Sequence, residues 1–400
     1  MSTLVLVESN TTGTGRMFCA AARARGLRPV VFARDPGRYP YLVEDAVEQV
    51  VVDTTDLAAM VAACARLGDV TGVTTSSELA VERAAELARA VGVPHPPVGA
   101  VRAARDKGRL RALLRDAGPP GPDFEVARAA DEAVAAASRI GYPVVVKPSR
   151  GTGSAGVRLC RTDAEVKAAV EDLDAVVAGS ADVAVLVESY LDGPEFSVET
   201  FDGEPVVVVG KHLSAHPHFV ELGHDLPARV SSAQRRAVAA GAVETLWALG
   251  LRWGAAHVEL RLTSGGPRVV EVNPRLAGGM IPAAVAAGFG VDLVDAVVAK
   301  AAGLDVGRVE ASAAGEAAIR FAVAGQDGVV TGVTGVERAL RVPGVERIVV
   351  TAPVGTAVHV RGSFQDRLGC VVATGSGAAA AAERALGMVG WDMSPVGRPE

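Results

Sequence analysis

The chain has 400 residues, and its 40 lysines and arginines against 46 aspartates and glutamates give a formal net charge of −6. This length predicts two or three domains, each able to bury its own core. The acidic balance and the lack of a long basic run argue against a nucleic-acid partner. No stretch reaches the roughly 18 consecutive apolar residues of a membrane span, which argues against a membrane partner.

The four cysteines are scattered without the spacing of a metal finger, which indicates reduced thiols in the cytosol. The first eight residues carry no basic segment ahead of their short apolar run, so they do not predict a secretory signal. We therefore expect a soluble, cytoplasmic protein.

Up to about residue 93, strand-like runs alternate with alanine-rich helical segments, and such alternation predicts a parallel α/β sheet. The expected strands are 4–7, 29–33, 49–52 and 70–74, and the expected helices are 16–25, 57–67 and 78–91. A glycine loop at 10–15 precedes a helix, but Phe18 occupies the third glycine position of a dinucleotide site, which favours a tight structural turn. One helix carrying Lys107 should follow and end at the Gly/Pro run 118–122.

A second glycine loop, Ser149 to Gly156, contains the pattern GxGxxG. A Rossmann loop opens a helix, whereas the residues after Gly156 predict a strand, so we expect a hairpin within a small α+β unit. The free backbone N–H groups of such a loop can cover phosphates, with Lys147 at its root. A plain flexible hairpin is the alternative. The other elements expected in this unit are helices at 130–140 and from 163, and strands at 142–147, 156–159 and 184–187.

The segment from Val187 to Phe196 joins a buried strand to the next block. An adenine could lie there against main-chain groups, with Glu188 and Glu195 available for its amino group and the ribose hydroxyls. The alternative is that both glutamates are ordinary surface acids.

The most informative spacing lies in two strand-like runs, 256–262 and 268–275. If residues 263–267 form a five-residue hairpin loop, Leu262 faces Arg268 and Glu259 faces Glu271. Opposed residues hold their Cβ atoms roughly 4.5 to 5.5 Å apart, where two carboxylates repel each other unless a cation lies between them. The opposite, apolar face would carry Val258, Leu260, Leu262, Val270 and Val272.

Asn273 shares the face of Glu271, and two carboxylates with an amide oxygen suit Mg²⁺, which usually also binds phosphate oxygens. The hairpin therefore predicts a Mg-nucleotide platform. Two solvated glutamates on an exposed sheet face are the alternative.

The remaining elements predict a third block and a tail. The expected strands are 196–201 and 205–210, the expected helices are 231–249 and 281–300, and residues 315–388 predict a β-rich tail that ends in a helix. The expected organisation is an N-terminal domain at 1–95, a linking helix at 96–121, two further units at 122–190 and 191–310, and the tail at 311–395.

Several of these segments together resemble the ATP-grasp ligases in order and spacing, over roughly residues 1–390. They are Lys107, Lys147 with its glycine loop, Glu188 to Glu195, Glu259, and Glu271-Val272-Asn273-Pro274-Arg275. Within that superfamily, residues 219–224 and 273–279 look most like the L-amino-acid ligases of the bacilysin type, which make dipeptides from free amino acids. The resemblance implies an α/β ATP-grasp fold with an N-terminal Rossmann-like parallel-sheet domain, a small α+β flap domain, and a C-terminal α+β domain with a β-rich tail.

The resemblance also implies roles for individual residues. The implied ATP site comprises Lys107, Lys147, Gly153, Ser154, Glu188, Ser189, Tyr190, Leu191, Glu195, Lys211 and His216. The implied metal ligands are Glu259, Glu271 and Asn273, for Mg²⁺ or Mn²⁺. The implied substrate pocket comprises Glu78, Glu221, His224, Arg275 and Gly278, with Arg275 as the catalytic residue. Where bacilysin-type enzymes can carry a bulky aromatic residue, this chain has Gly279, which predicts room for a larger substrate group.

The implied reaction joins a carboxylate to an amine. The carboxylate attacks the γ-phosphate of ATP, and the amine then displaces phosphate from the acylphosphate. The expected partners are small carboxylates and amines, amino acids by the resemblance, and a homodimer is left open.

Other interpretations stay open. A specialised natural-product or siderophore acid or amine, or bicarbonate, could replace the free amino acids. A nucleotide-binding regulatory protein that lacks catalysis is disfavoured because the lysines and the metal ligands are retained. A dehydrogenase is disfavoured because the first glycine loop is imperfect. Zinc is disfavoured because His212, His216, His218 and His224 lack helical HxxxH spacing.

Overall fold

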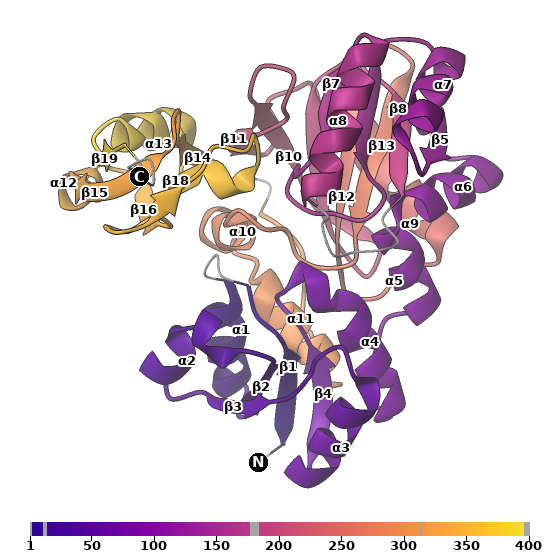
Figure 1. Cartoon of the computed structure of the whole chain (residues 1–400). Helices are drawn as coiled ribbons and strands as arrows, with labels where there is room; N and C mark the ends of the chain where they lie inside the picture. The colour runs from indigo at the N-terminus through magenta and orange to yellow at the C-terminus, as the bar shows by residue number, and fades with distance from the viewer. Residues whose placement is uncertain (1, 11–13, 177–183, 313, 396–400) are drawn as a thin grey trace, which may run out of the picture.

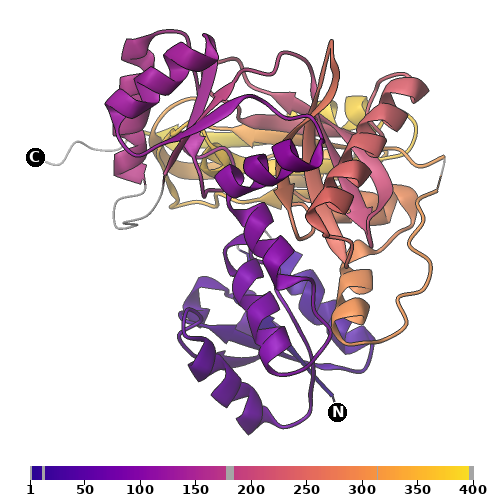
Figure 2. The same ribbon diagram turned by 90° about the vertical axis from the view of Figure 1, so that its right-hand side faces the viewer.

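The computed structural model describes residues 2–10, 14–176, 184–312 and 314–395. Figure 1 shows the N-terminal part at the bottom, residues 124–189 with the hairpin at 255–273 at the upper right, and the C-terminal part at the upper left. In the side view of Figure 2, the indigo N-terminal part lies below the rest of the chain. The mixed α/β architecture is the predicted class.

The N-terminal part is a parallel α/β layer, as the alternation of strands and helices predicts. Its sheet has the order β3-β2-β1-β4, with parallel pairing throughout. Residues 11–13 of the expected turn at 10–15 lie outside the described residues. The elements are β1 (Thr3–Val7), α1 (Thr14–Ala24), β2 (Arg28–Ala33), η1 (Pro36–Arg38), α2 (Tyr41–Glu44), β3 (Glu48–Val51), α3 (Leu57–Leu67), β4 (Val70–Thr74), η2 (Glu78–Ala80) and α4 (Val81–Ala90).

The single helix expected after Pro97 is two helices, α5 (Val98–Arg105) and α6 (Lys107–Ala117). Asp106 separates them because its backbone is extended and its carboxylate accepts a hydrogen bond from the Arg109 N–H, which makes it an N-cap. The break places Lys107 at the first residue of α6.

A small antiparallel sheet with the order β5-β8-β6-β7 follows. β6 and β7 pair with each other on either side of the glycine loop, so the predicted hairpin is confirmed. α7 and α8 pack against this sheet around one apolar core. The elements are β5 (Phe124–Ala127), α7 (Ala130–Ile140), β6 (Val144–Pro148), β7 (Arg158–Cys160), α8 (Asp163–Val176) and β8 (Val185–Ser189).

The largest sheet has eight strands in the order β13-β12-β9-β10-β11-β14-β18-β16. Three strands of the β-rich tail therefore extend the central sheet, because β14 pairs with β11. Its central elements are β9 (Glu195–Phe201), β10 (Glu204–Leu213), β11 (Glu221–Leu226), α9 (Ser232–Leu249), β12 (Ala255–Thr263) and β13 (Gly266–Asn273).

The tail also forms a separate three-stranded sheet, β17-β15-β19. Within residues 315–388 the last element is the helix α13, as expected, and β19 follows beyond those bounds. The elements are β14 (Ala317–Val323), β15 (Gly328–Thr334), α12 (Val336–Ala339), β16 (Val345–Val350), β17 (Ala357–Val358), η3 (Phe364–Asp366), β18 (Arg367–Thr374), α13 (Ala378–Leu386) and β19 (Gly390–Ser394).

The helix expected over 281–300 is also broken, into α10 (Ile281–Phe289) and α11 (Leu293–Ala301). Gly290 ends α10 in a left-handed conformation, and Asp292 caps α11. Among the described residues no single helix is both long and apolar enough to cross a membrane; α10 and α11 meet those limits only as a pair, which is bent by 109°.

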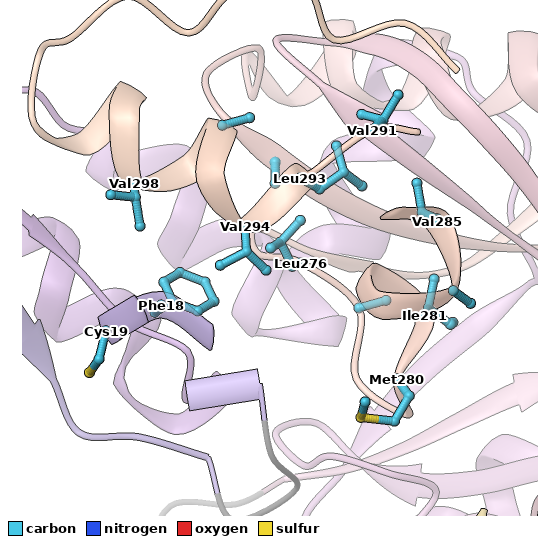
Figure 3. Close-up of a cluster of buried hydrophobic side chains, with 14 of the residues drawn as sticks. Phe18, Cys19, Leu276, Met280, Ile281, Val285, Val291, Leu293, Val294 and Val298 are labelled. Carbon is cyan, nitrogen blue, oxygen red and sulfur yellow. The ribbon is translucent and has the colours of Figure 1, made fainter. Parts of the chain in front are cut away.

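The bend lets α11 pack on the N-terminal sheet while α10 packs on β14. Figure 3 shows Phe18 and Cys19 of α1 beneath Val294 and Val298 of α11, with Leu276 beside Val294. One hydrophobic core therefore joins the N-terminal layer to the central sheet, just beside the loop that carries Arg275.

Candidate functional site

A pocket lies between the small sheet and the β12–β13 hairpin, because residues of both line it. Most of the expected ATP residues line it. Those residues are Lys107, Lys147, Gly153, Ser154, Glu188, Ser189, Tyr190, Leu191 and Glu195, together with the expected metal ligands Glu259 and Glu271. Lys211 and His216 lie behind this lining: Lys211 binds Glu195, and the His216 ring packs edge-on against Tyr190.

Glu259 opposes Glu271 as predicted, but the hairpin reaches that register in another way. Its loop has two residues between Thr263 and Gly266, not five, and Leu262 pairs with Pro267 rather than with Arg268. The tight turn needs Gly266, whose φ is 96°.

A bulge at Val270 compensates for the shorter loop. Leu260 pairs with Val269, and the next pair is Glu259 with Glu271, so β13 holds one extra residue. The bulge places Val270 in the pocket lining and Val269 in the core. The expectation that Val270 belongs to the apolar face is therefore wrong, and Val269 takes its place.

Each of the two opposed carboxylates has a cationic partner. Lys107 Nζ lies 3.0 Å from Glu271 Oε1, and Lys211 Nζ lies 3.0 Å from Glu259 Oε2. Burial alone would raise the pKa of Glu259, but Lys211 and His257 lower it below its ordinary value. The carboxylate is therefore ionised at neutral pH, and the expected repulsion is relieved by protein cations.

Asn273 supplies the observation that bears on a metal. Its Oδ1 atom is buried and has no hydrogen-bond partner, and the residue is only 3% exposed. A buried amide oxygen normally accepts a hydrogen bond or coordinates a cation. Two carboxylates and this oxygen are ligands that Mg²⁺ prefers, so the residues fit such an ion. Within the described ranges, no group of three or more His, Cys, Asp or Glu is placed to hold a metal.

Lys107 and Lys147 lie at the root of the glycine loop. The Lys107 backbone N–H donates to Ser149 O at 2.9 Å, and its Nζ donates to Gly151 O at 3.1 Å. Lys147 Nζ lies 2.6 Å from Glu188 Oε2. Burial lowers the pKa of Lys147, and Glu188 opposes that shift.

Glu188 and Glu195 are buried, so they are not ordinary surface acids. Arg111 Nε donates to Glu188 at 2.6 Å, whereas Glu195 binds Lys211 at 2.6 Å and Arg261 at 2.9 Å. The Arg261 guanidinium also donates to Leu191 O at 2.9 Å and lies over the Tyr190 ring at 5.4 Å. The segment expected to hold adenine is thus fixed by a network of arginines and carboxylates.

The expected substrate residues form two groups. Glu78 forms ion pairs with Arg275 and with Arg105, the latter at 2.6 Å. Burial would raise the pKa of Glu78, but the two arginines lower it. Arg275 does not line the pocket between the small sheet and the β12–β13 hairpin, and its Nε is buried without a hydrogen-bond partner. Open space adjoins Gly278, since no heavy atom lies within 4 Å of the position of an added Cβ.

The second group lies on β11. Glu221 binds Lys211 at 2.9 Å and Arg367 at 2.6 Å. His224 is buried, and neither of its ring nitrogens has a hydrogen-bond partner, although Nε2 lies 3.8 Å from Glu221 Oε2. Burial lowers the pKa of His224 to about 3, so it is neutral at pH 7 and a weak base. Lys211 joins this group to the nucleotide pocket, because it also binds Glu195 and Glu259.

Two family models match the chain in the regions that build these groups. An ATP-grasp domain matches residues 140–283, and the L-amino acid ligase C-terminal domain 2 matches residues 320–390. An uncharacterized protein of Sinorhizobium fredii, y4rH, is 34% identical over 402 residues, which cover 98% of this chain and 83% of that protein. The chain belongs to the ATP-grasp ligase superfamily.

Three further similarities place this ATP-grasp ligase among known proteins. Carnosine synthase 1 of Mus musculus is 28% identical over 54% of this chain, which matches only 29% of that longer protein. An L-amino acid ligase from Bacillus licheniformis has the same fold, with a TM-score of 0.85 and 23% identity over 98% of this chain and 99% of that one. The biotin carboxylase domain of a Hydrogenobacter thermophilus 2-oxoglutarate carboxylase, solved with MgADP, has a TM-score of 0.73 and 19% identity over 98% of this chain and 90% of that one.

The room expected beside Gly279 in this ATP-grasp ligase is already filled. A Cβ added to Gly279 would lie 3.2 Å from Phe321 Cζ, 3.5 Å from His224 Nε2 and 3.7 Å from Arg367 Nη1. Phe321 is itself covered by the Arg367 guanidinium, 3.8 Å from its ring centre. The expectation of a larger substrate space is wrong at this position, because an aromatic side chain from β14 occupies it.

Sequence reasoning missed four charged residues of the ATP-grasp site: Arg111, His257, Arg261 and Arg367. His257 Nδ1 lies 2.7 Å from Glu199, and its Nε2 lies 3.0 Å from Glu259. The alternation of side chains along a strand could have indicated His257 and Arg261. They lie two residues before and after Glu259 and share its face. Helical spacing could have found Arg111, four residues after Lys107. No local pattern indicates Arg367.

Proposed function

We propose that the chain is an ADP-forming carboxylate–amine ligase that acts in the cytoplasm and joins two small molecules, amino acids in the first instance, through an acylphosphate. The observation that carries the proposal is the hairpin pair Glu259 and Glu271 with the unpartnered Asn273 Oδ1 on the same face. This pair lies in the same pocket as the glycine loop and its two lysines.

The proposed reaction has two steps. A carboxylate oxygen attacks the γ-phosphorus of ATP and ADP leaves; the amine nitrogen then attacks the acyl carbon, and phosphate leaves with that oxygen while the nitrogen loses a proton. Glu259, Glu271 and Asn273 would hold Mg²⁺, or Mn²⁺ in its place, which neutralises phosphate charge when bound. Lys107 and Lys147 would bind phosphate oxygens, and the glycine loop would exclude water that could hydrolyse the acylphosphate.

Two features of the substrate side support an amino-acid substrate. Glu78 and Glu221 are ionised carboxylates that could bind a substrate ammonium group, and the planar donor fork of Arg275 could bind the developing oxyanion. His224, which belongs to the implied substrate pocket, is a weak candidate for binding a carboxylate or transferring a proton, because its pKa of about 3 leaves it uncharged.

The test measures ADP and phosphate release from Mg-ATP by the purified protein across pairs of free amino acids, with mass spectrometry of the products. Phosphate release that requires two amino acids and gives a dipeptide mass is the expected result. ADP release without a coupled amino acid would favour a specialised acid or amine. No turnover and no binding of Mg-ATP would contradict the proposed function.

A further inference from the structure

A short segment of the tail lies directly on the glycine loop. The Phe364 backbone N–H donates to Gly153 O at 3.3 Å. A Cβ added to Gly153 would overlap the Phe364 ring, so the ring packs against the bare Cα of the loop. Gly153 also has a φ of 60°, a conformation that glycine adopts without strain. We call residues 362–367 the strap.

The strap is held rigidly at its own turn. Ser363 and Asp366 cap each other's backbone, with the Ser363 N–H donating to Asp366 Oδ2 at 3.0 Å, and both residues are buried. Arg367, at the end of the strap, donates to the Glu221 carboxylate at 2.6 Å. Gly362, at the start, packs so closely on the His218 ring that an added Cβ would lie 2.5 Å away.

The glycine loop has two backbone hydrogen bonds of its own, from Ala155 N–H to Thr152 O and from Val157 N–H to Ser154 O, both at 3.2 Å. β7 is three residues long, and its pairing with β6 covers three residue pairs. Contacts made by the loop residues must therefore set its position. Ser154 Oγ donates to Phe219 O at 3.1 Å, Lys107 Nζ donates to Gly151 O, and the Phe364 ring covers Gly153 between those two contacts. Of these three, the Phe364 contact alone comes from the tail.

We propose that Phe364 is a positioning residue that sets the closed position of the glycine loop over the nucleotide phosphates, so that the tail takes part in ATP binding. The inference rests on the proposed ATP-dependent function. Phe364 does not line the nucleotide pocket, so it acts through the loop. Loss of the ring frees the loop from one side, and the loop N–H groups then cover phosphates less often.

The test compares Phe364→Ala with Phe364→Leu and with Val354→Ala, a matched tail variant whose side chain is 63% exposed. Binding of Mg-AMP-PNP and of AMP to the full-length proteins is measured by calorimetry. AMP carries the α-phosphate alone, whereas AMP-PNP also carries the β- and γ-phosphates that the loop would cover. Amide hydrogen exchange of residues 151–157 is measured in parallel.

For Phe364→Ala we expect about tenfold weaker binding of Mg-AMP-PNP, the size of one lost apolar contact, with AMP binding unchanged. Exchange in 151–157 should rise, Phe364→Leu should restore most of the affinity, and Val354→Ala should match the wild type. If Phe364→Ala folds poorly, the smaller change in Phe364→Leu carries the same comparison.

Three outcomes would overturn the inference. Equal AMP-PNP affinity in the wild type and Phe364→Ala would remove the strap from nucleotide binding while leaving the proposed function intact. Equal weakening of AMP and AMP-PNP would indicate a general structural role. A wild type that binds neither nucleotide would overturn the proposed function and this inference together.

Discussion

The proposed nucleotide half and the proposed substrate half of the site, called here the nucleotide half and the substrate half, differ in how their polar groups are paired. In the nucleotide half, which comprises the glycine loop, residues 188–195 and the β12–β13 hairpin, the carboxylates of Glu188, Glu195 and Glu259 each contact two cations. In the substrate half, around Glu78, Glu221 and Arg275, several buried nitrogens have no partner. They are both ring nitrogens of His224 and the Nε atoms of Arg275 and Arg367.

This difference indicates two kinds of site. A fully paired network holds its shape before a ligand arrives, whereas buried donors without partners cost free energy that a ligand can recover. Among the described residues, the nucleotide half has fewer buried polar atoms without a hydrogen-bond partner, namely Asn273 Oδ1 and Arg111 Nη1. The Asn273 oxygen lies where a cation would bind. We infer that the nucleotide half is preformed and that the substrate half is completed by its ligand.

The largest effect is expected from breaking the nucleotide half with Glu271→Gln. This variant removes one carboxylate charge and keeps the shape, so ADP formation should fall by more than the roughly 100-fold typical of losing an outer partner of a metal ligand. The fold should persist, because Glu271 makes one partly exposed ion pair. ADP release assays with a thermal melt check both, and exposed Glu204→Gln on β10 is the control. Wild-type turnover would contradict the metal assignment.

A smaller effect is expected from breaking the substrate half with Arg275→Lys. The charge remains but the planar donor fork is lost, so kcat should fall by roughly 100-fold, as when one oxyanion donor is removed. Because Arg275 lies outside the nucleotide pocket, Mg-AMP-PNP affinity should stay unchanged. Steady-state kinetics and calorimetry separate the two quantities, with Arg229→Lys as the exposed control. An equal loss of nucleotide affinity would show that the two halves are not independent.

Comparing Gly279→Ala with Gly279→Trp tests how closely the side chains of the substrate half pack around residue 279. The φ of 59° makes any side chain there cost about 1–2 kcal/mol of stability. Tryptophan should cost clearly more, because Phe321 fills the adjacent space, and Phe321→Ala should rescue Gly279→Trp in part. Unfolding in urea measures these free energies. If tryptophan costs no more than alanine, the space beside Gly279 is open after all.

The smallest effect on activity is expected at Asp225, which lies near the substrate half but outside it. Burial would raise its pKa, but His212 and Arg320 lower it from 3.8 to about 2. A lowered pKa in the folded state stabilises the protein above pH 4, and that stability is lost as the pH falls from about 4 to about 2. Asp225→Asn should therefore cost about 2 kcal/mol at pH 6 and progressively less below pH 4, with activity unchanged. A constant cost over that range, measured by urea unfolding, would contradict the assignment.

The nucleotide half could be predicted because its signals are local. The alternation of side chains within one hairpin predicts that Glu259 and Glu271 share a face. Lys147 is predicted from its place in the strand before the glycine loop. The wrong loop length did not matter, because the bulge at Val270 restored the register. Such a bulge is set by the core that Val269 fills, which the spacing of the sequence does not encode.

The substrate half resisted prediction because its parts come from distant segments. Phe321 and Arg367 belong to tail strands that join the central sheet through β11 and β14, and no short-range pattern places them beside Gly279. The two continuous helices expected around Asp106 and Asp292 were wrong for a different reason. Asp106 and Asp292 both carry capping signals, which were outweighed by the apolar, alanine-rich periodicity on either side.

The position of α11 constrains the order in which the chain can fold during translation. α11 packs on α1 and β4, and Arg25 binds Asp295 from 270 positions away. The N-terminal layer therefore leaves the ribosome long before the helix that covers one of its faces. Until then the apolar side chains of α1, Phe18 among them, lack their partner. Early protection of that face from aggregation should matter more for the yield of active protein than the stability of any single element.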